Sequence, residues 1–390
     1  MNSISSANSA ASRPQKILLL SVSAGAGHQR AAQALQASAA EHYPDWQVLH
    51  LDVMNYVTSG FRKIYTDFYL QLVNKAPTLW GYLYQVSNEA RPTSTMERLR
   101  RAIERLNARA LLDAIAEFNP DQIVCTHFLP AELLARLRKK AQLTTPVWVQ
   151  VTDFDLHRMW IHQGLQGYFC ANEEIAYRLQ QQNLLTTQIH ATGIPVMPAF
   201  AKTWSRQQCA TQWQIDANKP TILLMGGGAG LGGLEIVAES ILRLPGDTQL
   251  LVMAGKNQAT LAALQSLQGR YPERLRPFGF TNQVEQIMAC ADLIITKPGG
   301  LTTSECLAMG LPMIVNSPIP GQEERNADYL LEQGVALKAY DEMSLLYRLR
   351  QLLAQPQRLQ TLRARAQAIG KPGAAQQVLK VLADYANQHN

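Results

Sequence analysis

Two glycine-rich turns in the second half of the chain have the composition of anion-binding sites. The run at residues 226–233 follows an apolar segment and precedes a helix-like one, and Pro298-Gly-Gly300 stands in the same setting. Glycines let a backbone approach an anion closely, and the first turn of a helix offers free N–H groups and a positive dipole end. The first run matches neither a Walker A loop nor a dinucleotide fingerprint. Both turns therefore predict phosphate binding without identifying the compound.

Two side chains in the first half are suited to moving a proton. His28 ends the turn Ser23-Ala-Gly-Ala-Gly-His28, and Asp153 directly follows an apolar run. An imidazole or a carboxylate at the end of a strand can take a proton from a hydroxyl group. We expect His28 to be the base, with Asp153 as the second candidate, either as base or as the residue that orients an acceptor. A helix-start histidine without a chemical role is the alternative for His28.

Asp153-Phe-Asp155 has the spacing of a metal-binding acidic pair. We expect it instead to end a strand, with Asp153 serving the proton chemistry. The sequence therefore predicts no metal site and no cofactor.

Glu305 lies in the first turns of the helix expected after the second glycine turn, where Thr302, Thr303 and Ser304 add hydroxyl donors. A carboxylate there can accept hydrogen bonds from both hydroxyls of a ribose. A capping acid that merely favours the helix dipole is the alternative. The polar loop at 318–326 follows on the same face and can bond further sugar hydroxyls, so the two segments together favour a nucleotide-sugar site.

The elements that must position these residues alternate between strand and helix. Such alternation predicts a parallel sheet covered on both faces, with ligands bound at the carboxyl ends of the strands. The pattern occurs once in each half, which gives an α/β fold of two doubly wound sheets. The clearest apolar strands are at 16–22, 47–53, 122–126, 147–152, 221–225, 249–254, 293–296 and 312–316.

A length of 390 residues suits two domains. The stretch with Gly193, Pro195 and Pro198 has the composition of the linker between them. We expect a disordered leader at 1–14, a first domain at 15–197, a second domain at 198–371 and a C-terminal helix at 372–390 that packs back on the first domain.

The bulk composition restricts the setting. A net charge of +6 and a 17% charged fraction suit an acidic partner, but no basic-aromatic nucleic-acid platform is recognisable, so no nucleic acid is predicted. No apolar run reaches the roughly 20 residues that cross a bilayer, and the start does not resemble a secretory signal. We therefore expect a cytoplasmic protein whose five cysteines are buried thiols and whose membrane role is at the surface.

The segment at 57–109 has an interfacial composition. Seven of the chain's 28 aromatic residues fall in its first part, at 57–85, and six arginines with two glutamates follow at 91–109. Aromatic next to basic residues predicts contact with an anionic membrane surface, although a core helix followed by a solvated basic helix is the alternative. The candidate acceptor and membrane residues are Phe61, Tyr65, Phe68, Trp80, Tyr84, Arg98 and Arg101.

These motifs, in this order, resemble the GT-B glycosyltransferases. Gly300-Leu-Thr-Thr-Ser-Glu305 is similar to the enzyme that adds N-acetylglucosamine to the peptidoglycan lipid intermediate. Pro320-Gly-Gln-Glu-x-x-Asn326 is closer to monogalactosyldiacylglycerol synthases and bacterial diacylglycerol glucosyltransferases. The glycine-His turn at 23–28 and Val151-Thr-Asp153-Phe-Asp-Leu-His157-Arg-Met-Trp160 resemble the same family, so the resemblance spans about 15–345.

The resemblance implies two Rossmann-like lobes facing a cleft and assigns roles to the second lobe. Glu305 would hold the uridine ribose, Gln322 and Glu323 the donor hexose, and Lys256 would lie near the diphosphate. The backbone at 279–280 would read the uracil. The donor-binding residues implied are Gly227, Gly228, Gly230, Lys256, Gly279, Phe280, Gly299, Gly300, Thr302, Thr303, Glu305, Gln322, Glu323 and Asn326.

The implied reaction moves glucose or galactose from a UDP-sugar to diacylglycerol or a related membrane lipid. Two helix starts and Lys256 would stabilise the UDP leaving group without a metal. One base and direct displacement would invert the anomeric carbon and give a β-glycoside. The enzyme would be peripheral on the inner face of the cell membrane.

Other activities on the same fold remain open at this point. A UDP-sugar transferase with another lipid-linked or soluble acceptor is one, and a UDP-N-acetylglucosamine 2-epimerase is another. Departures from the family pattern, such as Ala229 in the glycine run, leave the sugar preference open.

Overall fold

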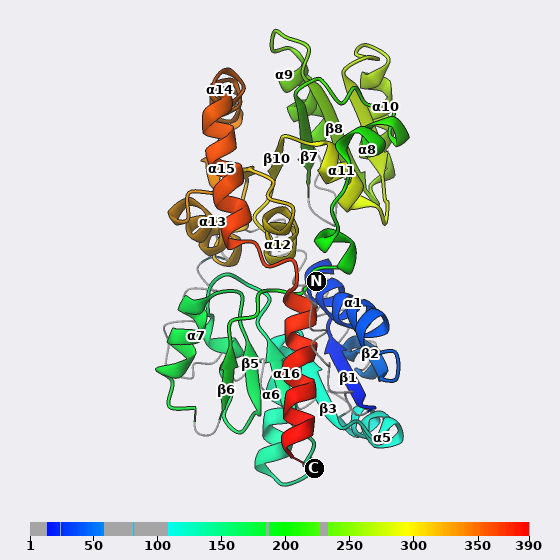
Figure 1. Ribbon diagram of the computed structural model, residues 1–390, viewed down its shortest axis with the longest axis vertical. Coiled ribbons are helices and arrows are strands. Elements are labelled where there is room, and N and C mark those ends of the chain that lie inside the picture. Colours follow the sequence, from blue (N-terminus) through cyan, green and yellow to red (C-terminus); the bar gives the residue numbers. More distant parts are fainter. Residues whose placement is uncertain are drawn as a thin grey trace, which may run out of the picture.

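The computed structural model describes residues 14–23, 25–57, 81, 108–184, 187–226 and 233–389. It contains two six-stranded parallel sheets, one in each lobe (Figure 1), which confirms the predicted α/β class. The first sheet consists of β1 (Lys16–Ser21), β2 (Gln47–Asp52), β3 (Gln122–Cys125), β4 (Val147–Gln150), β5 (Gly167–Phe169) and β6 (Gln188–His190). The second consists of β7 (Thr221–Met225), β8 (Gln249–Gly255), β9 (Leu275–Gly279), β10 (Leu293–Thr296), β11 (Met313–Asn316) and β12 (Ala336–Ala339).

Helices cover both sheets and join successive strands. In the first lobe they are α1 (Ala26–His42), η1 (Val53–Tyr56), α5 (Ala108–Phe118), α6 (Phe128–Lys139), η2 (Arg158–Trp160) and α7 (Glu173–Gln180). Between the lobes lies η3 (Pro198–Ala201). The helices of the second lobe are α8 (Arg206–Gln212), α9 (Leu234–Leu242), α10 (Gln258–Gln268), α11 (Val284–Cys290), α12 (Gly300–Ala308), α13 (Gln322–Glu332), α14 (Glu342–Ala354) and α15 (Pro356–Ile369). The chain ends with α16 (Ala374–Gln388).

The strand order sets where each lobe can bind a ligand. The first sheet runs β2-β1-β3-β4-β5-β6, and the second runs β12-β11-β10-β7-β8-β9. The chain therefore reverses direction across the sheet between β1 and β3 in one lobe and between β7 and β10 in the other. In open parallel sheets, ligands bind at the carboxyl ends of the strands beside such a reversal.

Strand β1 shows how the first lobe is assembled. Successive side chains of a strand point to opposite faces. Ile17 and Leu19 pack in one cluster with residues of α1 and α16, whereas Leu18 and Leu20 belong to the other cluster, which includes α5 and α6. All four are fully buried, as expected for a central parallel strand.

Helix α16 follows the second lobe in the chain but packs on the first. Figure 1 shows it along the first sheet, and Val378 and Leu382 pack there with Ile17 and Trp148. The amide of Gln122 on β3 donates a hydrogen bond to the Leu382 carbonyl at 2.9 Å. Near the point where the chain returns, Lys371 donates to the carbonyl of Ala191 at 2.9 Å. The polypeptide thus crosses between the lobes twice, at neighbouring places.

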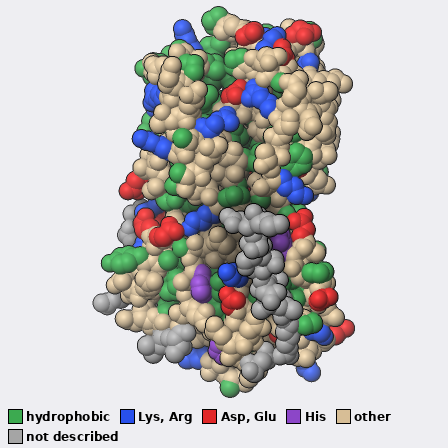
Figure 2. Space-filling model, in the orientation of Figure 1, with side chains coloured by type: hydrophobic (Ala, Val, Ile, Leu, Met, Phe, Trp, Pro, Cys, Tyr) green, Lys and Arg blue, Asp and Glu red, His purple; other side chains and the backbone are tan. Residues whose placement is uncertain are grey.

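The lobes touch each other rather than being only tethered. One cluster of buried apolar side chains continues from the first lobe into the second. Figure 2 shows that charged side chains of both signs gather around the junction. All five cysteines are free and buried. Among the described residues, no helix combines the length and the apolar character needed to cross a bilayer.

Candidate functional site

His28 lies where the carboxyl ends of β1, β3 and β4 meet. It is in the first turn of α1, and its Nδ1 is 2.9 Å from the carbonyl oxygen of Thr126, which follows β3. The same Nδ1 is 2.9 Å from Oγ1 of Thr152, which follows β4. The Thr126 hydroxyl in turn donates to the His28 carbonyl at 2.8 Å. The imidazole is therefore held by residues that follow β3 and β4, beside the reversal in the sheet.

These contacts fix the proton on the imidazole. A carbonyl oxygen can only accept, so Nδ1 must carry the hydrogen and donate it to Thr126, with the Thr152 oxygen as a second acceptor. Nε2 is then left with a lone pair, and no described residue makes a hydrogen bond to it. Burial lowers the pKa of His28 to about 4, so the ring is neutral at pH 7. A neutral imidazole with one fixed tautomer is in the form that can accept a proton.

The neighbouring histidines are used differently. His127 lies edge-on to His28 with ring centroids 4.5 Å apart, but its Nδ1 accepts the Leu129 N–H and caps α6. His157 likewise accepts the Met159 N–H and caps η2. Both rings are buried. Their accepting nitrogens are occupied by backbone, so His28 is the histidine left with an available lone pair at this edge.

Asp153 is a buried carboxylate that reaches the other lobe. Its Oδ1 accepts a hydrogen bond from the side chain of Gln322, the first residue of α13. Burial raises the pKa of Asp153 to about 6, and hydrogen bonds from Gln322, Trp160 and Asn326 work in the opposite direction. Asp153 is therefore mostly ionised at pH 7. The structure thus joins the second candidate base directly to a predicted hexose-binding residue.

Backbone contacts bring the start of α12 against the same edge. A Cβ at Gly300 would overlap the carbonyl oxygen of Thr152, so only glycine permits this approach. Asn326 is fully buried; its amide oxygen accepts the Phe154 N–H at 2.9 Å, and its amide group donates to Pro298 at 3.0 Å. The amide oxygen of Asn326 thus joins the lobes, and its amide group holds α13 to the second glycine turn. Its predicted contact with the donor stays a prediction.

The second half of the acidic pair turns away from Asp153. Asp155 forms an ion pair with Arg178 of α7, and Arg178 also donates to the Leu156 carbonyl at 3.1 Å. Among the described residues, no group of three or more His, Cys, Asp or Glu side chains is arranged to hold a metal ion.

Glu305 is a buried carboxylate on α12, facing the interface between lobes. Burial raises its pKa to about 7, Arg30 on α1 acts in the opposite direction, and Glu285 on α11 raises it further. No described residue donates a hydrogen bond to its carboxylate, and the buried Oγ1 of neighbouring Thr303 has no partner there either. Buried polar groups are nearly always satisfied, so the unpartnered Thr303 hydroxyl marks a place for a polar ligand.

Other predicted donor residues line the same edge of the second sheet. Lys256 follows β8, and its Nζ lies 5.3 Å from the ring centroid of Phe280, which follows β9. Phe280 is 63% exposed, so a flat face is available beside a cation. Glu323 accepts the Ile319 N–H at 2.7 Å and is close to Gly299. Gly279 and Thr302 lie at the end of β9 and in the first turn of α12.

Some predicted residues fall outside the described part of the chain. These are the acceptor and membrane residues Phe61, Tyr65, Phe68, Trp80, Tyr84, Arg98 and Arg101, and the donor residues Gly227, Gly228 and Gly230. Gly81, which is described, packs against Pro320 of the loop that leads into α13. Gly81 therefore lies against the predicted sugar loop.

Sequence reasoning missed the residues that hold His28. Thr126 and Thr152 each follow a buried strand, and polar residues at such positions are the signal that could have found them. Arg30, which contributes to the electrostatics of Glu305, was also missed. It lies two residues after His28 and therefore on the same helix start.

Two facing parallel sheets with their carboxyl edges in contact define the GT-B class, and solved structures support it. MurG of Acinetobacter baumannii aligns with a TM-score of 0.59 at 18% identity, over 94% of this chain and 99% of that one. MnaA of S. aureus, solved with UDP, gives 0.64 at 13%, over 96% and 97%. At these identities the likeness establishes the fold.

The family follows from the two halves of the sequence. Residues 28–196 match the model of monogalactosyldiacylglycerol (MGDG) synthase, and residues 221–378 match the glycosyltransferase family 28 C-terminal domain. A processive diacylglycerol beta-glucosyltransferase of Bacillus pumilus is 26% identical over 94% of both chains. Monogalactosyldiacylglycerol synthase 1 of Arabidopsis thaliana is 31% identical over 83% of this chain, which spans 62% of that protein. This chain belongs to the glycosyltransferase family of MGDG synthases and bacterial diacylglycerol glucosyltransferases, as its motifs predicted.

Proposed function

We propose that this protein moves a hexose from a UDP-sugar to the free hydroxyl of diacylglycerol and so forms a β-glycolipid. The relatives with these names match it along nearly the whole chain or over most of it. The chemistry rests on one observation, the fixed tautomer of His28 beside the contact between the lobes. A base at this edge and polar ligand-binding groups on α12 suit a transfer across the cleft.

On the acceptor side, Nε2 of His28 takes the proton as the lipid hydroxyl attacks the anomeric carbon. The imidazolium that forms keeps its Nδ1–H bond to Thr126, so no reorientation is needed during the step. Asp153, ionised at pH 7, favours positive charge nearby and is available to orient the acceptor. Attack from the face opposite the leaving group inverts the anomeric carbon.

On the donor side, Glu305 accepts hydrogen bonds from the ribose hydroxyls in its ionised form. The start of α12 and Lys256 stabilise the charge that develops on UDP. Lys256 and Phe280 form one corner of the site, with the exposed ring offering a face to the base or sugar. Gln322 is shared between Asp153 and the hexose, which ties sugar binding to the acceptor edge.

We further infer that the reaction takes place at the inner surface of the cell membrane. Diacylglycerol is confined to the bilayer, so the enzyme must reach its acceptor at the membrane. The composition of 57–109, with Phe61 and Arg98 among its residues, supports this segment as the contact. Gly81 of this segment lies against the loop before α13.

The direct test is chromatography of lipids after incubation with diacylglycerol and each labelled UDP-hexose. We expect one new β-glycosyl diacylglycerol with UDP-glucose or UDP-galactose, and none with the His28→Ala protein. Incubation without acceptor checks the epimerase alternative, because conversion of the UDP-sugar alone would contradict a transferase. A labelled product with a water-soluble acceptor but none with diacylglycerol would contradict the lipid assignment.

A further inference from the structure

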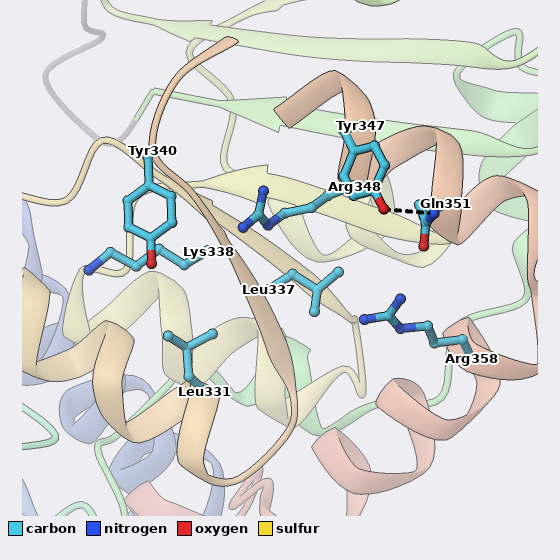
Figure 3. A pocket seen from close by; sticks show the side chains of 8 residues that line it. All are labelled: Leu331, Leu337, Lys338, Tyr340, Tyr347, Arg348, Gln351 and Arg358. Atoms are coloured by element: carbon cyan, nitrogen blue, oxygen red, sulfur yellow. Dashed lines mark hydrogen bonds between the residues drawn. The ribbon is translucent and has the colours of Figure 1, made fainter. Parts of the chain in front are cut away.

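A cavity lies on the second lobe, here called the donor lobe, away from the residues of the transfer site. It has a volume of about 390 Å³, opens to the surface and is lined by residues of β12, the end of α13, α14 and α15 (Figure 3). Strand β12 is an edge strand of the second sheet. None of the lining residues belongs to the donor site described above, and the transfer reaction does not use them.

Three cations face this cavity. Lys338 Nζ and the Arg348 guanidinium carbon each lie 5.7 Å from the ring centroid of Tyr340, and Figure 3 shows their ends flanking that ring. Arg358 reaches in from α15. Two cations at one aromatic ring repel each other, and an anion bound between or beside them offsets this repulsion.

Carboxylates do not neutralise these cations within the described part of the chain. None of the three forms a salt bridge there, and Arg348 donates only to the Ser344 carbonyl at 3.1 Å. Asp341 is near Arg348, but its carboxylate accepts the Ser344 N–H at 2.7 Å and caps α14. Hydrogen bonds from Ser344 lower the pKa of Asp341 first, and Arg348 adds to this. The cavity therefore offers excess positive charge.

The lining and the rim are amphiphilic. Leu331 and Leu337 form apolar wall beside the cations. Tyr340, Met343 and Tyr347 are 76%, 80% and 61% exposed, which makes three of the six strongly exposed large apolar side chains of the described residues. Exposed tyrosines with a methionine beside cations are typical of a surface that enters the headgroup layer of a membrane.

We propose that this cavity binds the phosphate headgroup of an anionic membrane phospholipid. Lys338, Arg348 and Arg358 bond the phosphate, and the leucines contact the start of the attached chain, which inorganic phosphate lacks. Tyr340, Met343 and Tyr347 enter the interface around it. The donor lobe thus has its own membrane contact, separate from the aromatic segment of the acceptor lobe.

The test measures binding of the full-length protein to vesicles at low salt. One set is phosphatidylcholine alone, and in the other about a third of the lipid is phosphatidylglycerol. General attraction to an anionic surface contributes about fivefold per cation, whereas a direct hydrogen bond to a charged phosphate contributes about tenfold or more. Arg348→Gln should therefore weaken binding to the anionic vesicles at least about 10-fold, and Lys338→Gln/Arg348→Gln about 100-fold. Binding to phosphatidylcholine vesicles should not change.

Arg350→Gln is the matched control, because Arg350 lies on the same helix, is exposed and does not line the cavity. It removes the same charge, so an equal loss with Arg350→Gln would reduce the effect to general attraction and overturn the proposal. Titration with inorganic phosphate and glycerol phosphate tests whether the ligand is a soluble phosphate and not a lipid headgroup. Variants that lose soluble phosphate but bind anionic vesicles normally would also overturn it. Unchanged thermal unfolding of the variants confirms that the fold is intact.

Discussion

The two edges that face each other across the lobes differ in how their polar groups are satisfied. On the first lobe, His28 and Asp153 already have hydrogen-bond partners. The partners of His28 fix its tautomer, and the partner of Asp153 joins it to the second lobe. On the second lobe, the Thr303 hydroxyl is buried without a partner among the described residues, and none of these residues donates a hydrogen bond to the Glu305 carboxylate. The two proton-transfer candidates of the first edge are therefore held in place before substrate arrives, whereas Thr303 and Glu305 on the second edge gain hydrogen bonds only when a ligand binds.

The difference matches what each edge has to do. A base must be oriented when the reaction begins, because proton transfer depends on geometry at that moment. A binding group gains most when its hydrogen bonds are made only with the ligand, since an unpaired buried group is costly. Changes on the first edge should therefore affect turnover, and changes on the second should affect UDP affinity.

The largest effect should come from His28→Ala. Loss of the base should lower kcat about a thousandfold. UDP affinity, measured by calorimetry, should stay within about twofold because His28 lies on the first lobe and the predicted UDP-binding residues lie on the second. A parallel loss of both would assign His28 to structure and would remove the contrast between the two edges.

Gly300→Ala should have the next largest effect. Its Cβ would overlap the Thr152 carbonyl, so the start of α12 must move away from the first lobe. A displacement of about 1 Å at a reacting centre lowers turnover roughly a hundredfold. Gly373→Ala, outside the predicted site, is the control, since a Cβ there would meet nothing within 4 Å. Equal turnover of the two variants would show that the close approach of the lobes is not needed.

Glu305→Gln should weaken UDP binding about 10- to 100-fold while leaving kcat at saturating donor nearly unchanged. Because the ionised carboxylate accepts the ribose bonds, binding to the unmodified protein should weaken as the pH falls through about 7. The variant should lack this dependence. Calorimetry between pH 6 and 8, bracketing that value, measures both, and an unchanged affinity would refute the ribose assignment.

The same substitution has a stability consequence of opposite sign. Burial raises the folded-state pKa of Glu305 from 4.5 to about 7. Its contribution to folding is therefore present below pH 4.5 and is lost as the pH rises through about 7. Without UDP, Glu305→Gln should thus be more stable than the parent protein at pH 8, on the order of 2 kcal/mol. Chemical denaturation of both proteins below pH 4.5 and at pH 8 measures this difference in the free energy of unfolding.

The smallest effect should come from Thr152→Val. The Thr126 carbonyl still fixes the tautomer of His28, but the ring loses its second acceptor. We expect kcat to fall about 5-fold with no change in KM for the UDP-sugar, in line with one neutral hydrogen bond. Thr152→Ser keeps the hydroxyl and should recover most of the rate. Failure of serine to recover it would mean that the methyl group, not the hydroxyl, positions the ring.

The fold could be predicted where burial leaves a continuous apolar run. The expected strand at 293–296 coincides with β10, and the helix expected at the end of the chain is α16. Strand β12 was not anticipated, because its sequence Ala-Leu-Lys-Ala belongs to an edge strand, which pairs with one neighbour only and need not be apolar throughout.

Motifs located the candidate site, but contacts between lobes could not be derived from spacing. Gln322 and Asn326 were expected to face the donor, and the structure joins both to the strand end at 153–154. Such pairs depend on how two sheets are set against each other, which no local pattern specifies. The roles assigned to these residues from the family stay predictions until the variants above are measured.

The position of α16 has a consequence for biosynthesis. Because it follows the donor lobe in the chain and covers Ile17 and Leu19, the first sheet keeps an uncovered apolar face until translation has passed the donor lobe. The half that is synthesised first is therefore the one that finishes folding last. A nascent chain in that state exposes an aggregation-prone apolar surface on the ribosome, and binding by a chaperone would matter most during this interval.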